Sequence, residues 1–304
     1  MSEIKIFVIS LKESNRTPKI IKRLKQLKIK FEIFYGINGH KKKNFSKLLK
    51  VYDEKKTENY IGRQLAFPEI AASLSHINIY KMIIRRRIKS AIIIEDDAYP
   101  SKILFKWIKM NTKIIDNSIL SFYSYPSGYL GKVGKKTRVE KVKIHTAVTH
   151  INNSSCYQIN LKTCKKIIKI TKGKICGVGD WPFNYKKDNI ILSSTLPYLT
   201  IIDDAFDSST APAREKFLKQ NKLINFFNKS ILFIIIKNLI YLSCIPFVLK
   251  KKMHFDFYKE QFFEKSFFFF KNIFLKNNIS TYTIFKDKNY YYDDLRLHRF
   301  FKKK

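Results

Sequence analysis

The chain has 304 residues, of which 45% are hydrophobic and 15% aromatic, and this composition excludes a wholly disordered protein, which lacks the apolar surface that offsets ordering entropy. Nine Gly and eight Pro exclude a collagen-like repeat. Sixty Lys and Arg against 24 Asp and Glu give a formal charge of +36, which either favours anionic partners (nucleic acid, an acidic membrane, phosphorylated substrates) or reflects a genome biased toward Lys, Ile, Asn and Phe.

The first 40 residues predict a βαβ unit. Residues 4–11 form a short apolar run rich in Ile and Val, which suits a buried strand of a parallel sheet. A helix is expected from Thr17 and Pro18, because Pro fits the first helical position and apolar residues follow at helical spacing. A second apolar stretch, 31–37, ends at the turn signal Asn38–Gly39. Strand, helix and strand in this order are typical of an α/β fold.

The next elements lead to a cluster of acids. Residues 40–59 are polar and predict a loop or short helices, whereas 68–87 predict a helix whose first turn contains Glu69. Residues 91–94 are a continuous apolar strand that runs into Glu95-Asp96-Asp97. Further strands are expected over 119–123, 142–150 and 156–159, and a further helix over 162–170.

The last third of the sequence is more apolar and aromatic. Residues 230–249 are long enough to span a membrane, but Lys237 near their middle would cost ~2.5–3.5 kcal/mol there. Lys250–Lys252 and the aromatic stretch 262–274 suit a helix that lies in a membrane interface. A packed helix, an interfacial helix and a spanning helix all stay open. We therefore divide the chain into a domain, 1–215, and a helical, basic, aromatic and membrane-proximal extension, 216–304.

The cysteines give no sign of a metal site. The four, Cys156, Cys164, Cys176 and Cys244, form no CxxC pair, which speaks against structural zinc and against a disulfide framework. The first 14 residues lack a basic region followed by a long apolar stretch, so we interpret them as a strand and not as a signal peptide. We expect a cytoplasmic protein with reduced thiols.

The strongest chemical signal is the run Glu95-Asp96-Asp97 at a strand end. Ligands of open α/β sheets bind at the carboxyl ends of strands. Three adjacent anions raise one another's pKa and persist best beside a cation, and carboxylate oxygens suit Mg²⁺ or Mn²⁺. Such an ion could bridge a nucleotide diphosphate and neutralise the charge that develops as it leaves. A solvated acidic turn is the competing interpretation.

A second signal is Ser75-His76 on the helix that precedes the acidic strand. Neighbouring residues on a helix point about 100° apart, so these two side chains do not form a Ser–His catalytic pair. We therefore reject a hydrolase.

Several segments together resemble glycosyltransferase family 25, the lipooligosaccharide and lipopolysaccharide β-galactosyltransferases and their relatives. In chain order they are FVISLKESNRT, FYGING, PEIAASLSH, IIIEDD, Cys156–Ile159 with the helix after it, Gly179-Asp180-Trp181, and Asp207–Thr210 before Arg214. The ordered set covers about residues 1–215 and is more specific than any single motif. Ala71-Ala72 stands where the family commonly has Gly-Cys, and no family motif covers 215–304.

The resemblance implies an α/β, GT-A-like fold, a Rossmann-type mixed sheet flanked by helices, that uses a UDP-sugar, with UDP-galactose favoured, and Mn²⁺ or Mg²⁺. It implies that Asp97 binds the metal directly. Arg16 is then expected to contact a phosphate or the uracil, and Asp96 to contact either the ribose or the groups that surround the metal and its ligand. The nucleotide-sugar-binding residues that it implies are Ser10, Leu11, Arg16, Asn38, Gly39, Ser75, His76, Glu95 and Asp96.

The resemblance also implies inversion, which needs a base at the acceptor hydroxyl. Asp180 is the candidate, although it could instead cap a helix after Gly179. The flat face of Trp181 could stack on a sugar. The reserve bases are Asp203, Asp204 and Asp207, and the expected acceptor-binding residues are Trp181, Asp207 and Ser209.

The leading hypothesis is a hexosyltransferase at the cytoplasmic face of the inner membrane, peripheral on its anionic surface, with a lipooligosaccharide or lipopolysaccharide acceptor. One alternative is a basic nucleic-acid-binding protein. We expect no nucleic acid partner, because the basic residues are spread along the whole chain and no known reader motif is present. Another alternative is a catalytically inactive, membrane-associated relative of these transferases.

Overall fold

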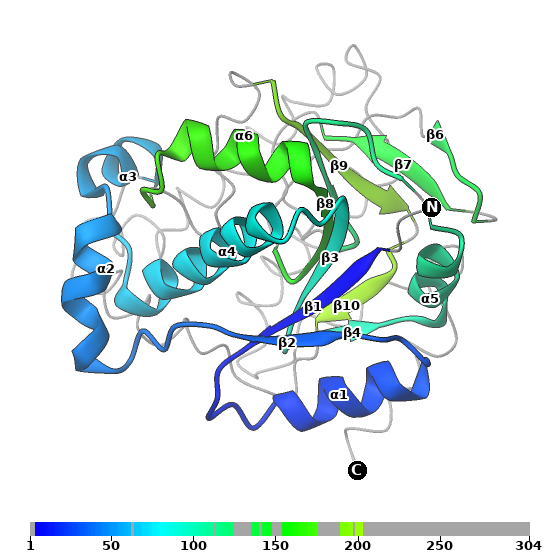
Figure 1. Cartoon of the computed structure of the whole chain (residues 1–304), viewed down its shortest axis with the longest axis horizontal. Coiled ribbons are helices and arrows are strands. Elements are labelled where there is room, and N and C mark those ends of the chain that lie inside the picture. Colours follow the sequence, from blue (N-terminus) through cyan, green and yellow to red (C-terminus); the bar gives the residue numbers. More distant parts are fainter. Residues whose placement is uncertain are drawn as a thin grey trace, which may run out of the picture.

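An eight-stranded mixed sheet with helices on both faces is the centre of this computed structural model (Figure 1). The structure describes residues 4–61, 64–111, 113–123, 135–139, 142–147, 154–175, 189–196 and 198–202. The strands are β1 (Lys5–Ser10), β2 (Glu32–Tyr35), β3 (Ser90–Glu95), β4 (Ala98–Pro100), β5 (Ser118–Ser121), β6 (Lys135–Lys136), β7 (Lys143–Thr146), β8 (Cys156–Asn160), β9 (Ile191–Leu196) and β10 (Thr200–Ile202). The helices are α1 (Thr17–Gln26), the short 3-10 helix η1 (Lys42–Asn44), α2 (Phe45–Val51), α3 (Glu54–Ile61), α4 (Phe67–Arg85), α5 (Lys102–Lys109) and α6 (Leu161–Thr171).

The strand order brings the ends of β1, β2 and β3 to one edge of the sheet. The order is β2-β1-β3-β8-β5-β9-β7-β6, and β1 is parallel to both of its neighbours. Ser10 pairs with Tyr35, and Ile9 pairs with Glu95, so the carboxyl ends of the three strands lie level. β8 runs antiparallel between β3 and β5, and β4 pairs with β10 in a separate two-stranded sheet.

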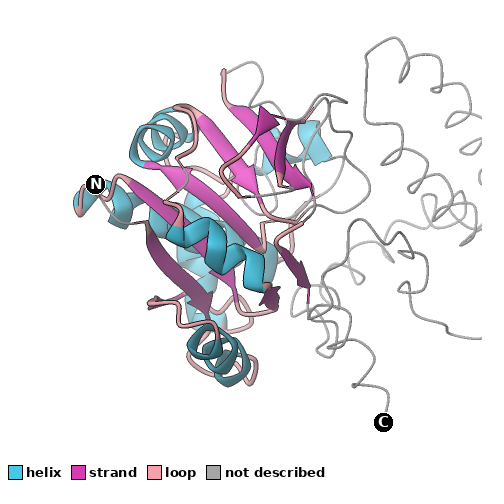
Figure 2. Cartoon of the chain, turned by 90° about the vertical axis from the view of Figure 1, so that its right-hand side faces the viewer, coloured by secondary structure: helices cyan, strands magenta, loops and turns pink. Residues whose placement is uncertain are grey.

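Alternation along the central strands creates two apolar layers, because successive side chains of a strand point to opposite faces. Phe7 and Ile93 belong to the layer that α4 and α6 cover. Val8 and Ile94 belong to the opposite layer, which α1 and α5 cover. Figure 2 shows helices in front of and behind the sheet. Burial on both faces explains why β1 and β3 are continuous apolar runs in the sequence.

Helix α4 begins where the sequence predicts, and its first turn is held by a side chain. Pro68 lies in that turn, and the buried Glu69 accepts a hydrogen bond at Oε2 from the backbone N–H of Ala66, 3.0 Å away. A carboxylate at a helix N-terminus satisfies a free backbone N–H and complements the helix dipole. This fixed start sets which residues of α4 face the sheet.

Most of the predicted elements are confirmed. The βαβ unit, short helices within 40–59, the long helix, the acidic strand end and the strand–helix pair β8–α6 are all present, with bounds that differ by a few residues. The strand expected over 142–150 ends at Thr146. The mixed sheet flanked by helices agrees with the α/β, mixed-sheet part of the predicted fold class, whereas the extension 216–304 lies outside the described residues.

Five elements were not predicted. Helix α5 has only eight residues, and its signal is the capping residue Ser101, whose Oγ accepts hydrogen bonds from the N–H groups of Ile103 and Leu104. β9 carries a buried Ser-Ser-Thr run and therefore lacks the apolar pattern of a strand. The other three, β4, β6 and β10, have two or three residues each, too few for a periodic signal.

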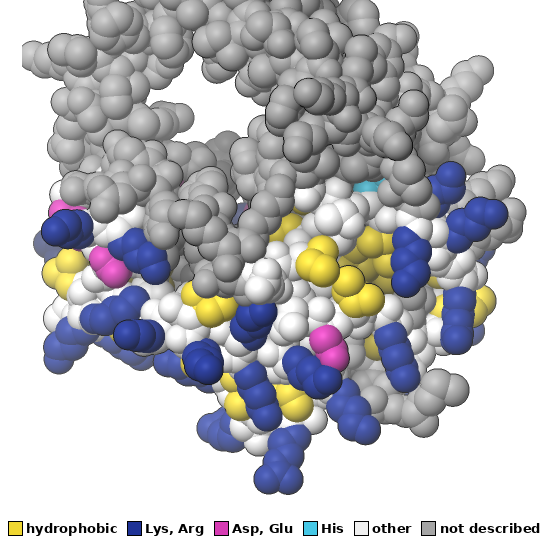
Figure 3. All heavy atoms as spheres, turned by 90° about the horizontal axis from the view of Figure 1, so that it is seen from above, with side chains coloured by type: hydrophobic (Ala, Val, Ile, Leu, Met, Phe, Trp, Pro, Cys, Tyr) yellow, Lys and Arg dark blue, Asp and Glu magenta, His cyan; other side chains and the backbone are white. Residues whose placement is uncertain are grey.

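Basic side chains are dispersed over the face that Figure 3 draws. Figure 3 shows Lys and Arg distributed across one face, with few carboxylates between them and no single basic stripe. Cys156 and Cys164 are free and buried, so neither is placed for surface chemistry. Among the described residues, no helix has the length and apolarity that crossing a membrane requires. The segment 230–249, for which three interpretations stay open, lies outside them.

Candidate functional site

A cleft of about 130 Å³ opens at the edge where β1, β2 and β3 end. Its walls come from these strand ends, from the segments that follow β1 and β2, and from α4. The lining residues are Ile9, Ser10, Leu11, Arg16, Gly36, Ile37, Gly39, His40, Pro68, Ala72, Ser75, His76, Glu95, Asp96 and Asp97. Eight of the nine predicted nucleotide-sugar residues are in this set, together with the predicted metal ligand. The fold therefore gathers residues that are up to 88 positions apart in the sequence, from Ile9 to Asp97.

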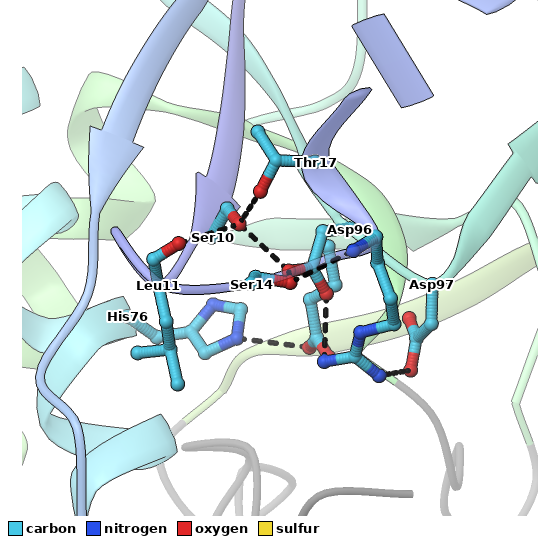
Figure 4. A network of polar contacts seen from close by, with 9 residues as sticks. Ser10, Leu11, Ser14, Thr17, His76, Asp96 and Asp97 are labelled. Atoms are coloured by element: carbon cyan, nitrogen blue, oxygen red, sulfur yellow. Dashed lines mark hydrogen bonds and ion pairs between the residues drawn. The ribbon is translucent and has the colours of Figure 1, made fainter. Parts of the chain in front are cut away.

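Asp96 holds the segment between β1 and α1 in place. Its Oδ2 accepts hydrogen bonds from Ser10 Oγ at 2.7 Å and Ser14 Oγ at 2.6 Å, and its Oδ1 lies 2.7 Å from Arg16 Nη2. Ser10 also contacts Thr17, the first residue of α1. Figure 4 shows these side chains converging on Asp96. Both carboxylate oxygens thus have protein donors, which gives Asp96 an organising role in the wall of the cleft.

Asp97 has a carboxylate oxygen that could accept a further ligand. Its Oδ2 lies 3.6 Å from Arg16 Nη1, whereas its buried Oδ1 has no hydrogen-bond partner among the described residues. Burial is the main cause that raises the pKa of Asp97 to about 7, and the charge of Glu95 adds to it, while Arg16 acts against it. A buried oxygen without a donor is costly, so this position favours a bound cation or a proton.

Glu95 has the opposite environment. Its Oε1 lies 3.1 Å from His76 Nε2 and accepts a hydrogen bond from Ser154 Oγ at 2.6 Å. Burial alone would raise the pKa of Glu95, but the hydrogen bond and charge of His76, followed by the Ser154 bond and Arg16, outweigh it and lower this pKa. Environments that drive two carboxyl pKa values apart are typical of sites with divided roles.

The residues at the cleft fit a divalent metal of the Mg²⁺ or Mn²⁺ type held by one side chain. No group of three or more His, Cys, Asp or Glu side chains in the described ranges is arranged to hold a metal ion. Mg²⁺, however, is commonly bound through one or two carboxylates together with substrate phosphates. The unpartnered Oδ1 of Asp97 supplies one such hard oxygen.

Ser75 and two glycines shape the cleft. Ser75 Oγ donates to the Ala71 carbonyl at 2.7 Å and accepts from the Ile37 N–H at 2.9 Å, which ties α4 to the end of β2. A Cβ at Gly36 would lie 2.8 Å from Ser75 Oγ, and a Cβ at Gly39 would lie 2.5 Å from the Phe67 carbonyl oxygen. Only glycine fits these two close approaches without a shift.

Asn38, the ninth predicted nucleotide-sugar residue, is not among the lining residues of this cleft. Its Oδ1 accepts a hydrogen bond from the His40 N–H at 2.9 Å, and its carbonyl oxygen accepts one from Asn44 Nδ2 at 2.8 Å. Asn38 therefore stabilises the turn after β2, which brings Gly39 and His40 to the cleft.

Ser75 and His76 have separate partners, in agreement with the rejection of a hydrolase. Ser75 bonds to backbone groups, whereas His76 bonds to Glu95 and, through Nδ1, to Tyr157 OH at 2.7 Å.

The predicted base and acceptor residues lie outside the described residues. These are Asp180, Trp181, Asp203, Asp204, Asp207 and Ser209. Their placement stays a prediction.

Sequence reasoning missed five side chains that complete the site, namely Ser14, Thr17, Tyr80, Ser154 and Tyr157. The i, i+4 spacing of His76 and Tyr80 was a usable signal, because it places both on one face of α4. The approach of Tyr157 depends on the pairing of β8 with β3, and no local pattern shows that pairing.

The comparison with protein families confirms the family that the sequence motifs resemble. Residues 3–182 match the family model described as glycosyltransferase family 25 (LPS biosynthesis protein). The match spans β1 to α6 and includes every described residue that lines the cleft. No curated protein sequence matches the chain.

Proposed function

The chain belongs to glycosyltransferase family 25, and from this premise we propose that it transfers a hexose from a UDP-sugar to a lipooligosaccharide or lipopolysaccharide acceptor, with inversion. The family supports a glycosyltransferase in LPS biosynthesis. The proposal adds the donor, for which UDP-galactose is favoured, the stereochemistry, the GT-A character of the fold and metal assistance.

One observation supports this proposal above the others. Asp97 presents a buried, unpartnered oxygen beside Arg16, in a cleft at the carboxyl ends of parallel strands. Ligands of α/β sheets bind outside such strand ends. A carboxylate and a guanidinium side by side can receive a metal–diphosphate group, because the metal needs oxygen ligands and the phosphates need donors.

The roles within the cleft follow from this pairing. Asp97 would hold Mn²⁺ or Mg²⁺. The positive charge of this ion would neutralise the negative charge that develops on the departing diphosphate. Arg16 donates to a phosphate oxygen, and Asp96 keeps the Arg16 segment oriented through Ser10 and Ser14. Leu11 and Gly39 line the cleft and are assigned to the nucleotide, and Gly39 allows the turn after β2 to lie close to the backbone of Phe67 at the start of α4.

The acceptor half of the reaction is assigned to residues outside the described part. Asp180 draws the proton from the attacking hydroxyl, which makes that oxygen a better nucleophile at the sugar carbon. The transition state has oxocarbenium character, and Trp181 stacks on a sugar ring. Asp207 and Ser209 contact the acceptor.

The proposed acceptor is borne by a membrane, and the formal charge of +36 supports association with an anionic membrane surface. A Lys or Arg close to an anionic lipid surface contributes ~1 kcal/mol to binding, so a basic protein associates with the membrane peripherally. The extension 216–304 and the inner face of the inner membrane are the proposed contact.

The direct test is release of UDP from UDP-galactose and UDP-glucose, with Mn²⁺ and a lipooligosaccharide acceptor. We expect the wild type to release UDP and Asp97→Asn to lose at least about 100-fold in rate, as for removal of a group that stabilises transition-state charge. Asp116→Asn is the matched control, because Asp116 forms an exposed ion pair with Lys162 and does not line the cleft. Absence of turnover with every UDP-sugar, or equal rates for Asp97→Asn and wild type, would contradict the proposal.

A further inference from the structure

A chain of polar side chains extends from the cleft into the apolar layer under α4. His76 Nδ1 lies 2.7 Å from Tyr157 OH, and Tyr157 OH lies 2.7 Å from Tyr80 OH. His76 is 2% exposed and both tyrosines are 0% exposed, among the apolar side chains of the layer between α4, α6 and the sheet. This row of polar side chains reaches the cleft at Glu95, because His76 Nε2 contacts Glu95 Oε1.

The hydrogen bonds of this chain have a definite direction at its outer end. An ionised carboxylate only accepts hydrogen bonds, so His76 Nε2 must carry a hydrogen and donate a hydrogen bond to Glu95 Oε1. In the neutral imidazole Nδ1 is then an acceptor, which receives the Tyr157 O–H, and the Tyr157 oxygen can receive the Tyr80 O–H. A doubly protonated imidazole donates to Glu95 as well. In both forms the tyrosines determine how the ring is oriented toward Glu95.

Two donors therefore fix one oxygen of Glu95. Both Ser154 Oγ and His76 Nε2 meet Oε1, while the side chain is 30% exposed and lines the cleft two residues from Asp97. Buried hydrogen-bond networks rigidify the groups that they contain, and Tyr157 on β8 is joined in this way to His76 and Tyr80 on α4. An immobilised carboxylate at a cleft wall is suited to accept hydrogen bonds from hydroxyl groups of a ligand.

We propose that Tyr157 and Tyr80 act through His76 as positioning residues, which hold Glu95 as the acceptor for a hydroxyl of the donor sugar. The inference rests on the proposed function, since it assigns the sugar of the UDP-sugar to the Glu95 side of the cleft. The nucleotide is assigned to the side of Ser10, Leu11 and Arg16, whereas the contacts of Tyr157 with His76 and Tyr80 lie on the α4 side of Glu95. Tyr157, Tyr80 and His76 therefore affect the affinity for the sugar part of the donor and leave the affinity for UDP unchanged.

The experiment measures dissociation constants of UDP, UDP-galactose and UDP-glucose with Mn²⁺, by calorimetry on the full chain. For Tyr157→Phe we expect the better of the two UDP-sugars to bind about 3- to 10-fold more weakly, as for the loss of one buried hydrogen bond, with UDP affinity within 2-fold of wild type. Tyr80→Phe is also expected to weaken UDP-sugar binding, by a smaller factor than Tyr157→Phe. Tyr35→Phe is the matched control, because Tyr35 is 51% exposed and does not line the cleft.

A second pair of variants covers the case in which Tyr157→Phe does not fold. His76→Gln keeps an N–H at about the position of Nε2 and is expected to retain UDP-sugar binding, whereas His76→Leu is expected to lose UDP-sugar binding and to keep UDP binding.

The double variant Tyr157→Phe with Glu95→Gln should weaken UDP-sugar binding by less than the sum of the two single effects, since both changes remove the same interaction.

Four results would overturn the inference. Equal loss of UDP and UDP-sugar affinity in Tyr157→Phe indicates a purely structural role. Unchanged UDP-sugar affinity in both Tyr157→Phe and His76→Leu indicates that Glu95 needs no positioning. If the wild type binds UDP but neither UDP-sugar, the tyrosines and His76 have no sugar contact to position, and if it binds none of the three compounds, the proposed function fails as well.

Discussion

Replacement of Asp97 by Asn is expected to stabilise the metal-free protein at neutral and alkaline pH. Its Oδ1 is buried without a partner among the described residues, and burial raises its pKa to about 7 from the ordinary 3.8. Asparagine has nearly the same shape and no charge, so it removes the cost of ionising this position in the folded state. A residue that serves a bound cation should show this conflict between stability and function.

The magnitude and the sign follow from linkage. Between pH 3.8 and pH 7 the unfolded chain ionises Asp97 while the folded chain keeps the proton, so rising pH lowers the free energy of unfolding. The full pKa difference corresponds to about 4 kcal/mol at 1.36 kcal/mol per pKa unit. The side chain is 24% exposed and solvent screens its charge, so we expect Asp97→Asn to gain about 1–3 kcal/mol above pH 7. The gain shrinks as the pH falls and disappears below about pH 4.

Thermal unfolding in EDTA from pH 4 to pH 8 measures this difference. Asp97→Asn should melt several degrees above wild type at pH 8 and together with it at pH 4. Asp116→Asn is the matched control, because its exposed ion pair with Lys162 predicts no gain at pH 8. An Asp97→Asn variant that is no more stable than wild type at pH 8, or whose advantage grows toward pH 4, would refute the reasoning.

Three further changes test the walls of the cleft. Arg16→Gln removes the guanidinium between Asp96 and Asp97, and calorimetry should show UDP binding about 10-fold weaker with Mn²⁺ present; unchanged affinity would remove Arg16 from the phosphate site. Gly39→Ala places a Cβ 2.5 Å from the Phe67 carbonyl oxygen, so urea unfolding should show a loss of about 1–3 kcal/mol, and a neutral result would mean that the turn adjusts freely. Ser75→Ala leaves the Ile37 N–H without its acceptor, and the same assay should show a loss of about 1 kcal/mol, with no loss if water replaces the hydroxyl.

The part of the fold that contains the cleft was predictable from the sequence because its strands are buried on both faces. Continuous apolar runs give a strong signal, and both β1 and β3 have one. The turn signal Asn38–Gly39 and the acidic strand end then located the edge of the sheet. The short or polar elements, such as β9 with its buried hydroxyls, follow from tertiary pairing, which no local pattern records.

The sequence predicts which acidic residues lie at the site, but it does not predict which hydrogen-bond partners each of them has. The sequence places Glu95, Asp96 and Asp97 together and treats them as one anionic group. Their partners come from other segments, Arg16 with two serines for Asp96 and His76 with Ser154 for Glu95. Of the three acids, Asp97 is the one that keeps a buried oxygen without a partner among the described residues. The sequence alone cannot show this, because the side-chain partners lie 19 to 86 positions away.

The account depends most on Asp97 receiving a metal that carries the diphosphate of the donor. The measurement that tests this most directly is calorimetric titration of UDP into the full chain with and without Mn²⁺, for wild type and Asp97→Asn. We expect Mn²⁺ to tighten UDP binding at least about 10-fold in the wild type and to have no effect on Asp97→Asn. UDP binding that ignores Mn²⁺ in the wild type, or that responds to Mn²⁺ equally in both proteins, would contradict the account.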